Sequence, residues 1–238
     1  GITDDKMKSF ALLSISSEFT KQKMVNESET AIHEALKTAQ GIAVNTKKPW
    51  PLRHKSSALS SISIEFFKRG EINLAEVVMQ EALDTVVEIF FADAQSSAVS
   101  AIAFKLASQE KIKMALETAR LIANDGIKSS AISSISSELA KKGKFKEANS
   151  TMQEALEIAK KILNERKRIA AFLAISVELG KQNRFKEAEA IQKETLDLVL
   201  MIKNVEDKNF ALADITLNLA KEGKIEKALQ IGQELVDF

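Results

Sequence analysis

The sequence predicts an all-α fold, an α-solenoid of six antiparallel helical hairpins, and three observations lead to it. Isoleucine recurs in one frame, with alanine four residues before it and a small residue thirteen after it. A period of 33 to 47 residues is typical of repeat proteins. The 238 residues include only eight glycines and two prolines, which favours long helices. We call the recurring isoleucines the anchors: Ile15, Ile62, Ile102, Ile135, Ile175 and Ile215.

The fourth repeat shows why each unit is predicted to be two helices. Its apolar residues from Ala131 to Leu139 recur on one face of a 3.6-residue helix. Gly143 then ends this helix, because glycine adopts the left-handed conformation common at helix ends. A second apolar stripe runs from Phe145 to Ala159. Each repeat is therefore expected to form two antiparallel helices joined by a short turn.

The other repeats carry the same turn and the same packing columns. The turn position holds Gly70, Gly143 and Gly223, or Asn183, whereas Lys23 and Glu110 stand there in the first and third repeats. Ten residues after each anchor we expect a further packing position, occupied by Val25, Ile72, Ile112, Phe145, Phe185 and Ile225. The serines that flank the anchors are interpreted as small residues that let neighbouring helices approach closely.

Two irregularities modify the pattern. Pro49-Trp50-Pro51 lengthens the first junction, and each proline disfavours helix at its predecessor, so Lys48 to Arg53 is predicted to be a loop. The third repeat lacks seven residues, close to two helical turns, so its second helix is predicted to be short, from Lys111 to Asn124. One domain, 1–238, is expected, with units of approximately 8–48, 55–92, 95–125, 128–164, 167–204 and 207–238.

These columns resemble the tetratricopeptide-repeat family. Gly143, Ala148 and Ala155 match the family's turn glycine and two packing alanines, as do Gly70, Ala75 and Ala82. The repeats depart from the family in their length of mostly 40 residues and in lacking its closing proline. The resemblance implies a right-handed superhelical array whose first helices line a concave surface that binds a peptide or protein partner.

The candidate binding site follows from that expectation. Two residues after the anchors lie the apolar residues Ile64, Phe104, Val177 and Leu217, and six residues after them lie Lys68, Lys141, Lys181 and Lys221. We predict a groove with an apolar and serine-lined floor and a lysine edge that meets carboxylates of an extended or helical peptide. The alternative is that the apolar residues pack against the next repeat and the lysines only complement the helix dipoles.

The sequence also predicts the exposure of three aromatic residues and the role of one column of glutamates. Phe90 and Phe91 are expected to pack at a helix end, whereas Trp50 is the best candidate for an exposed aromatic residue. A glutamate column three residues after the anchors is interpreted as inter-helix hydrogen bonding or a solvated edge; it comprises Glu18, Glu65, Glu138 and Glu178.

No constellation of catalytic residues, metal ligands or cofactor-binding motif is evident. The chain has no cysteine, and His33 and His54 lie on different elements without metal-ligand spacing. The glycines are isolated, so no phosphate-binding loop is predicted. We therefore expect a non-enzymatic protein with no catalytic or metal site and no cofactor.

Charge and hydropathy limit the classes of partner that we expect. A net charge of +1, from 34 basic and 33 acidic residues, argues against nucleic acid. No apolar run approaches the length of a membrane span, so no membrane partner is expected. A cytoplasmic location is slightly favoured, although a start at Gly1 is compatible with a missing native N-terminus. The leading interpretation is an interaction scaffold; a repeat-type RNA binder and a protein that forms homo-oligomers through its array ends, near Phe238, stay open.

Overall fold

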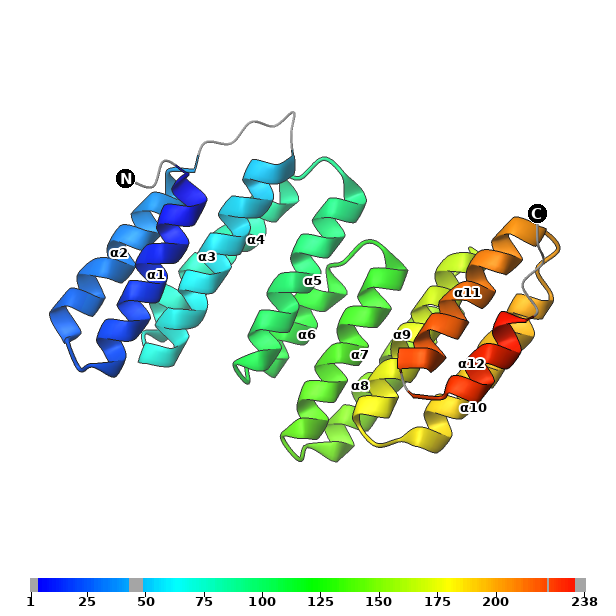
Figure 1. The fold of residues 1–238 in the computed structure, drawn as a ribbon. Helices are drawn as coiled ribbons and strands as arrows, with labels where there is room; N and C mark the ends of the chain where they lie inside the picture. The colour runs from blue at the N-terminus through cyan, green and yellow to red at the C-terminus, as the bar shows by residue number, and fades with distance from the viewer. Residues whose placement is uncertain (1–3, 43–48, 222, 234–238) are drawn as a thin grey trace. The chain divides into compact units, whose positions relative to one another are not determined.

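The computed structural model describes residues 4–42, 49–221 and 223–233, and within them the chain is all-α, as predicted (Figure 1). Twelve consecutive helices in this described part pair as six antiparallel hairpins. The chain forms two compact units, 1–124 and 125–238, and each is described by itself. The expectation of a single domain stays a prediction, and the C-terminal residues expected to mediate self-assembly lie outside the described residues.

The first unit contains three hairpins, and adjacent first helices pack side by side. Their second helices lie in another layer, where α2 and α4 also contact the first helix of the next hairpin. The pairs are α1 (Asp5–Lys21) with α2 (Val25–Gln40), α3 (Pro49–Arg69) with α4 (Ile72–Val87), and α5 (Ala92–Ser108) with α6 (Ile112–Arg120).

The second unit repeats this arrangement with three further hairpins. The first helix α9 contacts both neighbouring first helices, and α8 and α10 each contact the first helix that follows. The pairs are α7 (Asp125–Lys141) with α8 (Phe145–Lys160), α9 (Glu165–Lys181) with α10 (Phe185–Leu200), and α11 (Val205–Lys221) with α12 (Ile225–Gly232).

The predicted loop at the first junction is wrong where the structure describes it, because α3 begins at Pro49. Pro49 and Pro51 both lie in the first helical turn, where backbone N–H groups have no intrahelical acceptor and a proline therefore loses no hydrogen bond. The short second helix of the third repeat is confirmed. It has nine residues and ends at Arg120, earlier than the predicted end at Asn124.

The anchors form the core of each unit, with one exception. Five of the six isoleucines are buried, whereas 45% of Ile15 is exposed. Ile15 lies on α1, which has no preceding hairpin among the described residues to cover it. The anchor frame therefore marks core positions, and within the first unit Ile62 and Ile102, which follow another hairpin, are buried whereas Ile15 is not.

Serine hydroxyls fasten the two helices of several hairpins. The serine after the anchor donates to the backbone carbonyl of the small residue thirteen after the anchor: Ser16 to Ser28 (3.0 Å), Ser63 to Ala75 (2.6 Å) and Ser136 to Ala148 (2.7 Å). Six residues before the anchor, Ser9 and Ser129 donate in the same way to Ala35 (3.0 Å) and Ala155 (2.9 Å). The small residues of the frame therefore let the two helices of a hairpin approach closely, and the serines also form a hydrogen bond between them.

All six hairpin turns contain a residue with positive φ, including the two turns that lack a glycine or asparagine. Lys23 and Glu110 have φ of 62° and 63°, Asn183 has 59°, and the three turn glycines lie between 75° and 81°. A non-glycine residue with a long side chain is strained in this region by about 1–2 kcal/mol. The left-handed turn residue is thus kept in all six hairpins, even where the sequence does not favour it.

We expect Gly143→Ala to destabilise the protein by about 1 kcal/mol and Lys23→Gly to stabilise it by about 0.5–1 kcal/mol. The matched control is Gly180→Ala on α9, where the backbone is helical and an added Cβ would meet nothing within 4 Å. This control should stabilise by about 0.5–1 kcal/mol. Urea unfolding followed by circular dichroism measures all three; equal signs for the two glycine substitutions would contradict the turn assignment.

Candidate functional site

The first-helix layer of the first unit carries two of the predicted groove residues, and they differ. Ile64 is buried and offers no surface to a partner. Phe104 on α5, at the same frame position, is 51% exposed. An exposed phenylalanine in the second half of a helix otherwise rich in Ala and Ser is available for contact.

The second unit shows a similar difference. Val177 on α9 is partly buried, whereas Leu217 on α11 is 53% exposed. Of the four apolar residues predicted to form the groove floor, Phe104 and Leu217 therefore present large exposed surfaces.

The predicted lysine edge consists largely of ion pairs. Lys68, Lys141 and Lys181 are exposed, and each ammonium pairs with the glutamate three residues earlier on its own helix: Glu65 (3.3 Å), Glu138 (2.6 Å) and Glu178 (2.7 Å). In the last repeat Lys221 is also exposed, but Asn218 stands at the glutamate position. Glu65, Glu138 and Glu178 therefore pair along their own helices, which the sequence did not predict, and the predicted inter-helix hydrogen bond is present at Glu178, which accepts from Ser134 on α7. A partner carboxylate would have to compete with these glutamates, whose side chains are largely buried beside the half-exposed lysines.

The third repeat replaces the glutamate with Lys105, which turns inward. Its ammonium donates to the carbonyl oxygen of Ser57 (3.1 Å) and to the hydroxyls of Ser60 and Ser61 (both 2.9 Å) on α3. These three acceptors match the three N–H donors of an ammonium group. Burial lowers the pKa of Lys105 to about 8. Lys105 therefore links α5 to α3 and titrates close to neutral pH.

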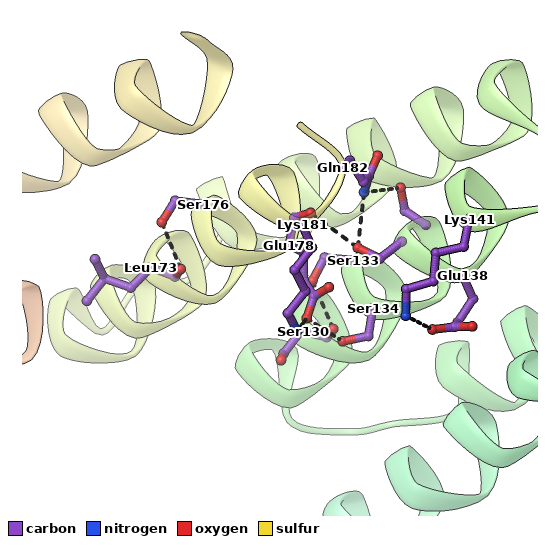
Figure 2. A network of polar contacts seen from close by, with 12 residues as sticks. Ser130, Ser133, Ser134, Glu138, Lys141, Leu173, Ser176, Glu178, Lys181 and Gln182 are labelled. Atoms are coloured by element: carbon purple, nitrogen blue, oxygen red, sulfur yellow. Dashed lines mark hydrogen bonds and ion pairs between the residues drawn. The ribbon is translucent and has the colours of Figure 1, made fainter. Parts of the chain in front are cut away.

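The equivalent position in the second unit carries the opposite charge (Figure 2). Glu178 on α9 accepts a hydrogen bond from the Ser134 hydroxyl on α7 (3.3 Å), at the residue just before the anchor. Ser61 occupies that same place beneath Lys105. A serine hydroxyl can donate or accept, so the serine columns accommodate a carboxylate in one repeat and an ammonium in another.

A second bridge between adjacent first helices lies seven residues after the anchor. The Gln182 amide donates to the hydroxyls of Ser136 and Ser137 on α7, both at 3.2 Å (Figure 2). At the same frame position in the first unit, the Arg69 guanidinium contacts the hydroxyls of Ser16 and Ser28. Sequence reasoning missed this bridge. Its signal is a long polar residue whose repeat position faces the serine column of the preceding repeat.

The expected packing position ten residues after the anchors is wrong for five repeats. The first residues of these second helices are exposed, namely Val25, Ile72, Phe145, Phe185 and Ile225. Each begins its helix at the hairpin turn, where little of the partner helix remains to cover it. Ile112 in the third repeat is partly buried.

The aromatic residues between repeats are also more exposed than expected. Phe90 is 87% exposed and Phe91 is exposed too, so their predicted packing at a helix end is wrong. They lie between α4 and α5, and their rings meet edge to face with centroids 5.7 Å apart. Trp50 is exposed, as predicted, and the Arg53 guanidinium stacks over its ring at 5.3 Å from the centroid.

The chain was compared with protein-family models and with curated proteins. No protein-family model matches the chain, and no curated protein matches it significantly. In the described part of the chain, no helix is long and apolar enough to cross a membrane, and no cluster of three or more His, Cys, Asp or Glu side chains could hold a metal ion.

Proposed function

We propose that the chain is a non-enzymatic, tetratricopeptide-like interaction scaffold that binds a peptide or protein segment on its first-helix layer. The observation that carries the proposal is the exposure of Phe104 and Leu217, two large apolar side chains at one frame position in helices packed among other first helices. A few residues supply most of the binding energy in many interfaces, and exposed apolar surface marks sites of interaction.

The surroundings of these side chains suit a peptide. Lys–Glu pairs lie on the adjacent first helices, α3 beside the α5 of Phe104 and α9 beside the α11 of Leu217, and we assign them to a polar rim. Because Lys68, Lys141 and Lys181 are already paired, we assign the lysines orientation and specificity, and we assign the affinity to the apolar residues. Each unit therefore offers one exposed apolar side chain, Phe104 in the first and Leu217 in the second.

The proposal is tested by selecting peptides from a random display library on the intact chain and measuring their affinity for Phe104→Ser and Leu217→Ser. We expect at least one substitution to weaken the binding of a selected peptide about tenfold or more. This is the effect of losing one buried apolar contact. Phe90→Ser is the matched control, because Phe90 is more exposed but lies outside the first helices.

Three outcomes would contradict the scaffold. One is a library that yields no binder; another is a set of binders that respond to Phe90→Ser and ignore both first-helix substitutions. The third is retention on RNA that falls steeply with salt, which would favour the repeat-type RNA binder.

A further inference from the structure

A cavity of about 280 Å³ opens among α1, α3 and α5 of the first unit. Four basic side chains from these three helices line it: Lys6 from α1, Arg53 and His54 from α3, and Lys105 from α5. Serine hydroxyls line the remaining polar wall, and Ala98, Ala101 and Ile102 form an apolar one. The volume is sufficient for a small ligand or for one functional group of a larger one.

The positive charge of this cavity is not neutralised locally. No carboxylate lines it, and in the part of the chain that the structure describes, Lys6, Arg53 and His54 form no ion pair. The nearest acidic influence on His54 is Asp4, whose carboxylate already caps α1 by accepting from the Met7 amide (3.1 Å). A cluster of unpaired cations around a void attracts anions.

The ionisation of His54 reflects the same arrangement. Its pKa is lowered first by burial and then by the charge of Lys6, with a further contribution from Arg53, while Asp4 acts in the opposite direction. Any anion bound among these groups would raise this pKa, because it would stabilise the protonated imidazole.

The hydrogen-bonding groups favour a tetrahedral oxyanion. The Arg53 guanidinium is held against the Trp50 ring, and a guanidinium of fixed orientation suits the paired oxygens of a phosphate group. Lys105 is positioned by its three bonds to Ser57, Ser60 and Ser61, so its charge is fixed at the cavity wall. Several cations from three helices can balance a doubly charged group better than a single carboxylate.

We propose that this cavity is a binding site for a phosphate group, enclosed by Lys6, Arg53, His54 and Lys105. The site is separate from the exposed apolar residues of the proposed peptide surface. The phosphate group can belong to a small phosphate ester or to a phosphorylated side chain, and the two sources are distinguished below.

The test uses the two histidines of the chain as reporters. Their imidazole NMR signals are titrated with pH in sodium sulfate, a tetrahedral dianion, and in sodium chloride of equal ionic strength. We expect sulfate to raise the pKa of His54 saturably by about 0.5–1 while exposed His33 follows the chloride series. Equal behaviour of the two histidines, or of the two salts, would overturn the proposal.

Substitutions locate the binding. Arg53→Gln and Lys105→Met should each weaken sulfate binding about tenfold, whereas Lys113→Met, at a 90% exposed side chain in the same unit, should not. Arg53→Gln keeps the test decisive if the buried Lys105 proves necessary for folding. Unchanged affinity in Arg53→Gln would overturn the assignment.

The source is identified with three further probes at equal concentration: inorganic phosphate, glycerol 3-phosphate and a phosphoserine peptide. Tighter binding of glycerol 3-phosphate indicates a small phosphate ester, and tighter binding of the peptide indicates a phosphorylated side chain. Failure of all three to shift His54 would overturn the proposal even if sulfate did so. Because the library peptides of the scaffold test carry no phosphate, the two proposals can fail separately.

Discussion

Ile62→Ala is expected to destabilise the first unit by about 2–5 kcal/mol. The substitution removes buried apolar surface and leaves a cavity that the surrounding side chains fill only partly. Ile62 is an anchor on α3 and is fully buried between hairpins. A loss of this size is a large fraction of the stability of an ordinary domain. Trp50 is the only tryptophan and lies on the same helix, so its fluorescence during urea unfolding reports directly on this unit.

Ile15→Ala is the matched control for this prediction. It makes the same substitution at the same frame position in the same unit, but Ile15 is 45% exposed. We expect it to cost about 1 kcal/mol or less, because nearly half of this side chain stays in water and its removal leaves no enclosed cavity. Similar losses for the two variants would show that the anchor frame does not mark the contact between hairpins.

The second large effect is a pH dependence of stability that Lys105 introduces. Its pKa falls from 10.5 to about 8 on folding, which corresponds to at most about 3 kcal/mol. Below pH 8 the residue is charged in both states, and the folded state bears the full cost of burying the ammonium. Between pH 8 and 10.5 the unfolded chain binds the proton and the folded chain does not, so stability rises with pH.

We therefore expect wild type to gain stability relative to Lys105→Met when the pH rises from 7 to 10. The difference of the two unfolding free energies, measured with urea at each pH, isolates the titration of this one residue. Lys113→Met, whose side chain is almost fully exposed, should show no such change. A wild-type advantage that is equal at both pH values would contradict the lowered pKa.

The helices and most of the core could be predicted because the repeat supplies several independent copies of one pattern. Five anchors are buried, and the short α6 follows from the missing seven residues. Periodicity alone cannot show where a neighbouring helix ends, however. This is why Ile15 and Phe145 were assigned to the core although the structure exposes them.

The candidate site was predictable only in part, for a related reason. The frame places four apolar residues two positions after the anchors, but periodicity does not show which of them neighbouring side chains cover: Ile64 is buried and Phe104 is exposed. The cavity beside Lys105 requires Lys6, Arg53 and His54, which belong to no repeated column, to converge from two other helices. A search for recurring residues cannot find such a site.

Chemical-shift mapping of the intact chain with a selected peptide tests whether the proposed partner binds to the first-helix layer. We expect perturbations concentrated around Phe104 on α5 or Leu217 on α11 and extending to adjacent first helices of the same unit. Perturbations confined to the second helices, such as those around Phe145 and Phe185, would contradict it.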